Sequence, residues 1–336
     1  MRKLMPVTTS RPLRRLLLAI AASALMAAPT ACGSGDRSAA AAAHDVKHEF
    51  GTSALPDDPQ VVVALDEYSA MDLLALGIVP KVVFTGYGSA ISQKILGTTG
   101  SELVKIPVGS TIKSTTVFSY HPDLVVFSSI GDRTMYNQLA PTVPTLPLTS
   151  ITTKWRDRLT TIGADFRRED KAKHIVDALD RQLAAVKTGH AASTPVSIAV
   201  LMSYSGKLAS LSGDAQLRSL LTDAAFDTPG AEKRTDSNHQ PYLALSPENL
   251  VDHEANVTAV LAEGVWNADA VRGQPTFARL RGHPVDVNGD MWSGSFPFAI
   301  YWTAADLAAI ERGDWAAVAK EKNANERYQQ FTEMIK

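Results

Sequence analysis

The chain of 336 residues contains a single cysteine, so it forms no intrachain disulfide. It also has no excess of one charge: 33 Lys and Arg face 35 Asp and Glu, and the net charge of −2 does not indicate a nucleic-acid partner. Beyond the amino-terminal region, no apolar run is long enough to cross a membrane. With 45% hydrophobic residues, the composition is that of an ordinary globular protein, long enough for two lobes.

Sequence motifs of common catalytic sites are missing as well. The chain has no Gly-x-Ser-x-Gly elbow, no glycine-rich phosphate loop and no His-Glu-x-x-His metal motif. The serine-bearing loops 203–206 and 292–295 match none of these patterns. A hydrolase is therefore the least favoured alternative, and we expect no enzymatic activity.

The amino terminus has the three parts of a secretory signal peptide. Arginines precede the short apolar run 16–22, and small residues follow up to Cys32. The segment ending at Cys32 resembles a bacterial lipobox, although Pro29 stands where leucine is usual. The resemblance implies removal of residues 1–31 and lipidation of Cys32, which would anchor the protein to the outside of the cell membrane. The alternative is an ordinary secreted protein with an incidental cysteine.

Residues 32–59 predict a flexible tether, because a glycine- and alanine-rich segment buries too little surface to order itself. His44 and His48 have the spacing of metal ligands on one helix face, but no third ligand is nearby in the sequence. We expect them to be loose tail residues.

Buried strands alternate with helices from Gln60 onward. The β-branched, apolar runs 61–65, 81–85 and 124–127 are typical of strands covered on both faces. Residues 70–76 have a helical pattern that ends at a glycine. This alternation predicts an amino-terminal α/β lobe over residues 60–150 with a mainly parallel sheet.

A helical region separates this lobe from a second one. Apolar residues at 175, 179, 183 and 186 form a stripe that predicts one long helix within linking residues 151–190. Runs 196–201 and 258–261 predict strands of a second α/β lobe over 191–336, with terminal helices at 304–310 and 315–320. The fold class is thus two α/β lobes with mainly parallel sheets, joined by one long helix, and ligands in such sheets bind at the carboxyl ends of strands.

Three motifs in this order carry a family resemblance: 72–77 (DLLALG), 121–125 (HPDLV) and 246–250 (SPENL). Over residues 60–336 the chain resembles the ABC-importer substrate-binding proteins for iron-siderophores, haem and cobalamin. The resemblance implies an extracytoplasmic monomer that captures a ferric siderophore in the interlobe cleft and passes it to a membrane permease with a cytoplasmic ATPase. Haem or cobalamin in the same cleft is the alternative. The iron chelate would be cargo, so no resident cofactor is expected.

The resemblance also implies one acidic docking residue for the permease in each lobe. Glu248 fits that position in the second lobe, while the matching stretch 114–118 of the first lobe contains no glutamate. Glu102 or Asp132 would have to substitute there. Glu248 is otherwise an ordinary residue in the first turn of a helix capped by Ser246.

Aromatic walls and a few cationic donors suit a bulky, often anionic ferric siderophore. Candidates at the strand ends are Tyr68, Tyr87 and Arg133 in the first lobe and Tyr204, Arg234, His239, Tyr242, Trp266, Trp292 and Tyr301 in the second. Each aromatic residue could instead belong to the core, and each cation to the solvated surface. Direct metal-ion binding is less favoured, because Glu67, Tyr87, Ser128 and His239 are the only ligand types at these loops.

Overall fold

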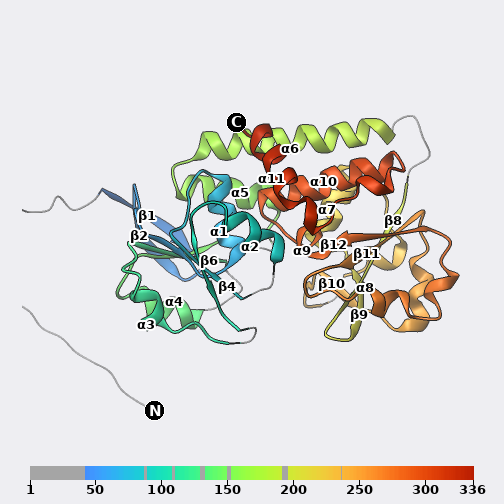
Figure 1. Cartoon of the computed structure of the whole chain (residues 1–336), viewed down its shortest axis with the longest axis horizontal. Helices are drawn as coiled ribbons and strands as arrows, with labels where there is room; N and C mark the ends of the chain where they lie inside the picture. Colours follow the sequence, from blue (N-terminus) through green and yellow to red (C-terminus); the bar gives the residue numbers. More distant parts are fainter. Residues whose placement is uncertain are drawn as a thin grey trace, which may run out of the picture. The chain divides into compact units, whose positions relative to one another are not determined.

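Strands and helices alternate in the order expected for two α/β lobes. The computed structural model describes residues 42–86, 89–107, 110–128, 133–149, 153–190, 196–235 and 237–336, and Ala41–Lys336 form one compact unit. Figure 1 shows two sheets side by side, with helix α6 (Glu169–His190) running along both. The expected fold class is confirmed. The predicted signal peptide and Cys32 lie outside the described residues.

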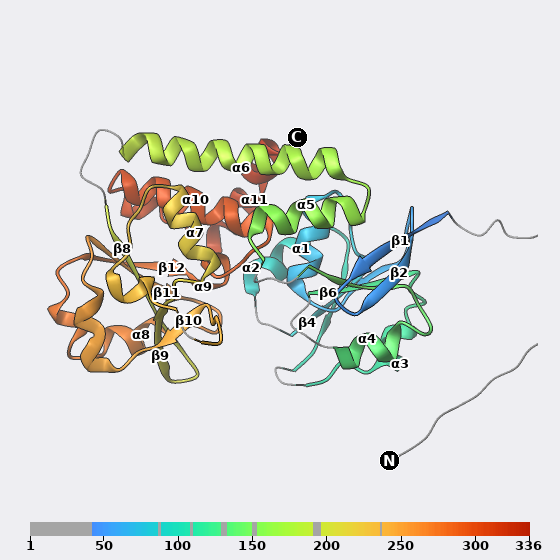
Figure 2. The same ribbon diagram turned by 180° about the vertical axis from the view of Figure 1, so that it is seen from behind.

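The first sheet is entirely parallel, with strand order β5-β4-β3-β6-β7. All residues of β3, β4, β6 and β7 are buried, because helices cover both faces of these apolar strands. Figure 2 shows α1 and α2 over one face and α3 and α4 over the other. The bounds are β3 Val62–Ala64, α1 Glu67–Ala75, β4 Val82–Thr85, α2 Ala90–Leu96, β5 Glu102–Lys105, α3 Ser114–Phe118, β6 Leu124–Ser128, α4 Arg133–Leu139 and β7 Thr145–Leu148.

The strand order of this sheet reverses between β3 and β6. From β3 the chain moves outward to β4 and β5, then crosses back to form β6 on the other side of β3. In open α/β sheets, such a switch point leaves a crevice outside the carboxyl ends of the two strands. The fold therefore places the residues that follow β3 and β6 at a natural binding position.

Two helices link the lobes. They are α5 (Trp155–Asp165) and the longer α6, whose apolar stripe Ile175, Leu179 and Leu183 is buried against the core. A buried ion pair of 2.5 Å joins Arg158 of α5 to Asp72 of α1. The linking region is thus fastened to the first lobe by packing and by charge.

The second sheet has the order β10-β9-β8-β11-β12 and is mixed. Strands β8, β11 and β12 are parallel, whereas β9 runs antiparallel to both β8 and β10. The prediction of mainly parallel sheets thus holds fully only in the first lobe, because a two-residue turn at Ser205 and Gly206 reverses the chain after β8. The bounds are β8 Ile198–Tyr204, β9 Lys207–Leu211, α7 Gln216–Asp223, η1 Gly230–Lys233, β10 Tyr242–Ala244, η2 Pro247–His253, β11 Val257–Ala262, α8 Ala268–Arg272, η3 Phe277–Arg279, β12 His283–Asn288 and α9 Gly289–Trp292.

The carboxyl-terminal segment returns to the first lobe. Helix α10 (Pro297–Glu311) is buried between α6 and α1, and α11 (Ala324–Met334) packs on α2. The helix predicted at 304–310 is thus part of a longer one, and 315–320 contains only the 3-10 turn η4 (Trp315–Ala317). A second such turn, η5 (Glu321–Asn323), leads into α11. The predicted second lobe 191–336 therefore includes helices that pack on helices of the first lobe.

The predicted tether 32–59 is wrong over its described part, which forms an antiparallel hairpin of β1 (Ala43–His48) and β2 (Gly51–Pro56). Ser53 Oγ donates to the Thr145 carbonyl of β7 at 2.6 Å, and His44 Nε2 lies 2.9 Å from the Asp165 carbonyl of α5. Leu55 is fully buried. Side chains that alternate toward the core hold the hairpin against β7 and α5. His44 is therefore part of the folded structure and not a loose tail residue.

Candidate functional site

Asp66 organises the switch point of the first sheet. Its carboxylate follows β3, is 3% exposed, and accepts hydrogen bonds from the backbone N–H of Ser69 at 2.7 Å and of Ser128 at 2.6 Å. The first bond caps α1, and the second fixes the end of β6. Asp66 was not predicted as a site residue, although an Asp between a strand and an apolar helical pattern is a helix N-cap signal.

A pocket of about 260 Å³ whose lining side chains are mostly apolar opens at the carboxyl ends of β3, β4 and β5. Tyr87 follows its lining residue Gly86 in the chain but lies outside the described residues. A pocket of this kind can take a hydrophobic part of a small molecule. Its lining residues are Leu65, Phe84, Gly86, Ile106, Pro107, Ser110 and Ile112.

Three of the predicted aromatic residues meet in the second lobe. The Trp266 ring lies 6.0 Å from the rings of both Tyr204, at the end of β8, and Tyr242, on β10. Tyr204 is 53% exposed, so one side of its ring is open to solvent. Gly289 permits this packing, since a Cβ there would lie 2.1 Å from the Trp266 ring. We call Tyr204, Trp266 and Tyr242 the aromatic cluster.

Carboxylates lie directly beside the aromatic cluster. Trp266 Nε1 donates to Asp290 Oδ1 at 3.3 Å, and Asn288 Nδ2 donates to Glu263 Oε2 at 2.7 Å. Burial, with a smaller contribution from the negative charges of Glu67 and Glu263, raises the pKa of Asp290 to about 7, although the hydrogen bond from Trp266 lowers it. The site therefore has a surplus of negative charge. Glu263 and Asp290 were not predicted, because only the fold brings them close to the aromatic cluster and no sequence motif marks them.

Helix α1 brings residues of the first lobe close to the aromatic cluster and its carboxylates. Burial raises the pKa of Tyr68 well above its ordinary value, and the charge of Asp290 in the second lobe adds to the shift. The Tyr68 ring lies 5.7 Å from the ring of Phe296, which precedes α10. Glu67 is fully buried and accepts a hydrogen bond from Gln93 Nε2 at 3.0 Å. We call the strand-end pocket, the aromatic cluster, Glu67, Tyr68, Glu263 and Asp290 together the interlobe site.

Two predicted aromatic residues are core residues instead. Trp292 is 1% exposed and donates through Nε1 to Asp306 Oδ2 at 3.0 Å. Tyr301 is 8% exposed, stacks on Phe298 beside Phe331, and donates to Gln330 Oε1 at 3.2 Å. Their placement differs from the expected binding wall, because the glycine- and aromatic-rich stretch folds inward and starts the buried helix α10.

The predicted cationic residues also point to other partners. The guanidinium carbon of Arg133 lies 4.7 Å from the centre of the Phe50 ring, and Phe50 is on the turn of the β1–β2 hairpin. Arg234 donates through Nε to the Ala231 carbonyl at 3.1 Å, and His239 lies 3.1 Å from Asp214. The structure therefore does not bring Arg133, Arg234 or His239 to the aromatic cluster.

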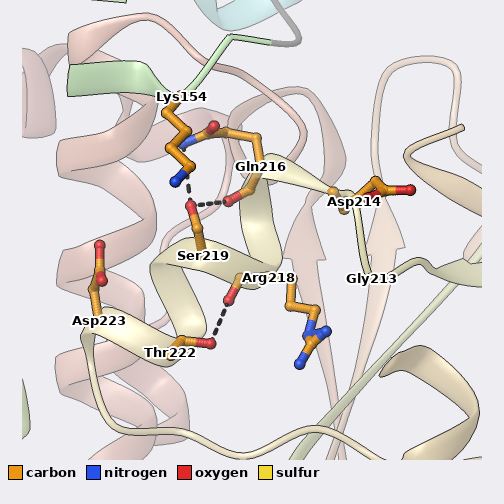
Figure 3. A pocket seen from close by; sticks show the side chains of 9 residues that line it. Lys154, Gly213, Asp214, Gln216, Arg218, Ser219, Thr222 and Asp223 are labelled. Carbon is orange, nitrogen blue, oxygen red and sulfur yellow. Dashed lines mark hydrogen bonds between the residues drawn. The ribbon is translucent and has the colours of Figure 1, made fainter. Parts of the chain in front are cut away.

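A hollow of about 400 Å³ lies between the start of α5 and helix α7 (Figure 3). Its lining has mixed charge, with Lys154 and Arg218 against Asp214 and Asp223. Arg156 already bonds Asp223 at 2.8 Å. This hollow lacks aromatic residues and does not lie at the strand ends, so it is a weaker candidate than the interlobe site.

Metal-ion and catalytic sites find little support in the part of the chain that the structure describes. No group of three or more His, Cys, Asp or Glu residues there could hold a metal ion. Ser203 is fully buried, and Ser293 Oγ donates to the Gly289 carbonyl at 2.7 Å, which leaves neither serine poised as a nucleophile. Within the same residues, no helix has the length and apolar character needed to span a bilayer.

Glu248 lies exposed on η2, apart from the interlobe site. The predicted helix start is a 3-10 helix here, and the Ser246 side chain does not cap it. Leu250 is buried, and His253 Nδ1 lies 2.9 Å from the buried Glu232 Oε1, so η2 is firmly held. Glu102 is exposed on β5, and Asp132 lies outside the described residues.

Comparisons with known proteins agree with this architecture. A family model described as "Periplasmic binding protein" matches residues 62–281. The chain is 23% identical over 216 residues to the "Probable siderophore-binding lipoprotein YfiY" of Bacillus subtilis; the match covers 63% of this chain and 66% of that protein, just under two thirds of its length.

Solved structures share the fold at low sequence identity. Staphylococcus aureus SirA complexed with staphyloferrin B superposes with a TM-score of 0.65 at 17% identity, over 80% of this chain and 98% of that one. A periplasmic solute binding protein from Mycobacterium smegmatis gives 0.65 at 20% identity, over 82% and 98%. The catecholate-siderophore binding protein VctP from Vibrio cholerae gives 0.61 at 18%, over 80% and 100%.

Proposed function

The chain belongs to the periplasmic binding protein family, and we propose that it is the substrate-binding component of an ABC importer that captures a ferric siderophore between its lobes. The names of its relatives support this cargo: a probable siderophore-binding lipoprotein, and structures that include a complex with staphyloferrin B. As a member of a family of binding proteins, the chain is not an enzyme.

One observation carries the proposal. The carboxyl ends of the first sheet open into an apolar pocket, while the second sheet presents an aromatic cluster at its own strand ends. Tyr68 and Asp290 bring the two lobes together beside them. A bulky chelate with apolar spacers and polar oxygens around its metal would find complementary surfaces there.

The same proposal includes a membrane anchor and a permease. A lipoprotein relative and the segment around Cys32 support lipidation outside the cytoplasm. Exposed Glu248 on a rigidly held η2 suits a charged contact with a permease arginine. Glu248 would then make the contact with the permease, and no residue of the interlobe site would have to face the membrane.

Tryptophan fluorescence tests the proposal, because Trp266 lies within the interlobe site. We would titrate the full chain, purified in detergent, with ferric hydroxamates, ferric catecholates, haem and cobalamin. Saturable quenching by a ferric siderophore is expected, and Trp266→Phe should remove most of it. The matched control is Trp315→Phe, since Trp315 stacks on His283 away from the site. Saturation by haem or cobalamin alone would contradict the siderophore assignment, and no response to any ligand, confirmed by equilibrium dialysis, would contradict the function.

A further inference from the structure

The charge of the interlobe site differs from that expected for an anionic cargo. Asp290 and Glu263 lie beside the aromatic cluster, and among the residues that the structure describes neither forms an ion pair. Arg133 and Arg234, the expected cationic donors, are engaged at other places. An anionic chelate would therefore meet like charge here.

The lysine beside the open side of the aromatic cluster adds little positive charge. Lys207 pairs with Tyr204 across the β8–β9 turn, but it is exposed, so solvent and salt screen its charge. Lys207 therefore does not neutralise the carboxyl groups beside the aromatic cluster.

Aromatic rings next to carboxylates are the chemistry that recognises an organic cation. Ring faces attract ammonium groups electrostatically, with Trp strongest, and a carboxylate within contact distance adds a charge-assisted hydrogen bond. Trp266 supplies such a ring between Tyr204 and Tyr242, the backbone of half-buried Glu263 pairs with that of Trp266, and Asp290 accepts from the indole N–H. The 53% exposure of Tyr204 leaves one side of the cluster open to a ligand.

We propose that the aromatic cluster, together with Glu263 and Asp290, binds a positively charged group, such as an ammonium, carried by the ferric chelate. The inference rests on the proposed function and narrows its cargo to neutral or cationic chelates, typical of hydroxamates, rather than anionic catecholates or carboxylates. The metal centre would face the apolar pocket of the first lobe, and the pendant cation would face the second lobe.

A matched ligand pair tests this selection. Ferrioxamine B carries a pendant ammonium, N-acetyl ferrioxamine B keeps the same iron chelate without that charge, and the N-succinyl form replaces it with a carboxylate. We expect the full chain to bind the ammonium form about tenfold more tightly than the acetyl form, and the succinyl form most weakly, as cation–π and charge contacts of this size predict.

Protein variants complete the test. Glu263→Gln and Asp290→Asn each keep a hydrogen-bond acceptor and should weaken binding of the ammonium form about fivefold, while affinity for the acetyl form stays within about twofold. Asp177→Asn is the control, because it removes the same charge from the exposed face of α6. A second cluster variant, Tyr204→Leu, should act in the same direction and does not depend on a buried carboxylate.

The outcomes separate this inference from the proposed function. Equal affinity for all three ligands, or a preference for the succinyl form or for ferric catecholates, would refute charge selection and leave siderophore capture standing. Binding of no ferric chelate of any charge would refute both. A preference for the ammonium form that survives in Glu263→Gln, Asp290→Asn and Tyr204→Leu would place the cation elsewhere and refute the assigned site.

Discussion

The buried ion pair between Asp72 and Arg158 makes a quantitative prediction about how the linking helices are fastened to the first lobe. The two side chains are 0% and 1% exposed and 2.5 Å apart. Asp72→Asn leaves the guanidinium without a counter-charge, and breaking a buried pair in this way costs about 3–5 kcal/mol of unfolding free energy.

Arg158→Met should behave differently because Asp72 can take up a proton. Burial already raises the pKa of Asp72, and the attraction of Arg158 opposes that rise, so the variant pushes it higher. A carboxyl with a raised pKa in the folded state loses stability as pH rises, by about 1.4 kcal/mol per pH unit up to that pKa. The penalty of Arg158→Met should therefore be smaller at about pH 5 than at about pH 7.

Urea unfolding of both variants at these two pH values measures the contrast. The double variant Asp72→Leu/Arg158→Met is the control and should be close to neutral, since well-packed apolar groups often replace a buried pair without loss. A pH-independent penalty for Arg158→Met would show that Asp72 reaches solvent once its partner is gone. That result would refute the reasoning that the pair is sealed in the core.

Three further predictions concern the anchor, the docking surface and the interlobe site. Cys32→Ala should release the protein into the medium, as fractionation and blotting would show; retention at the membrane would contradict lipid anchoring. Glu248→Ala should slow uptake of the radio-iron chelate while leaving its affinity unchanged, because Glu248 lies outside the interlobe site; a loss of affinity would place it in the wrong role. The pKa of Asp290, raised from 3.8 to about 7, favours the protonated folded state, so its contribution to stability should be lost as pH rises through that range. The unfolding midpoint of Asp290→Asn should therefore increase relative to that of the wild type as pH rises. A difference between the two midpoints that does not change with pH would contradict the burial of this carboxyl.

Local patterns in the sequence predicted most of the framework. Runs such as 61–65 combine β-branched residues without polar interruption, which only a strand covered on both faces accommodates, and the stripe at Ile175 and Leu179 repeats at helical spacing. The β1–β2 hairpin escaped prediction because only Val46, Ser53 and Leu55 turn inward, within a composition typical of linkers. Its partners on β7 and α5 lie far away in the sequence.

The same distinction between local pattern and long-range contact applies to the residues of the candidate site. Tyr204 and Trp266 directly follow predicted strands, so their place at the strand ends could be anticipated. Trp292 was misplaced because its partner Asp306 lies on the next helix, and only the folded chain shows that the two are buried together. Asp290 gains its significance from Glu67 in the other lobe, a proximity that no local pattern reports.

The course of the carboxyl-terminal segment bears on how such a site selects its ligand. Helix α10 packs on both α6 and α1, α11 packs on α2, and the Tyr68 ring contacts Phe296, so three connections besides the linking helices tie the second lobe to the first. A wide opening would have to separate α10 from α1 and α11 from α2, and exposing each large apolar side chain buried between them would cost about 1.5–3 kcal/mol. The lobes should therefore separate little, and the aromatic cluster and its carboxylates are held largely preformed. A preformed site spends little binding energy on ordering side chains, so discrimination between chelates falls to charge and shape at the strand ends.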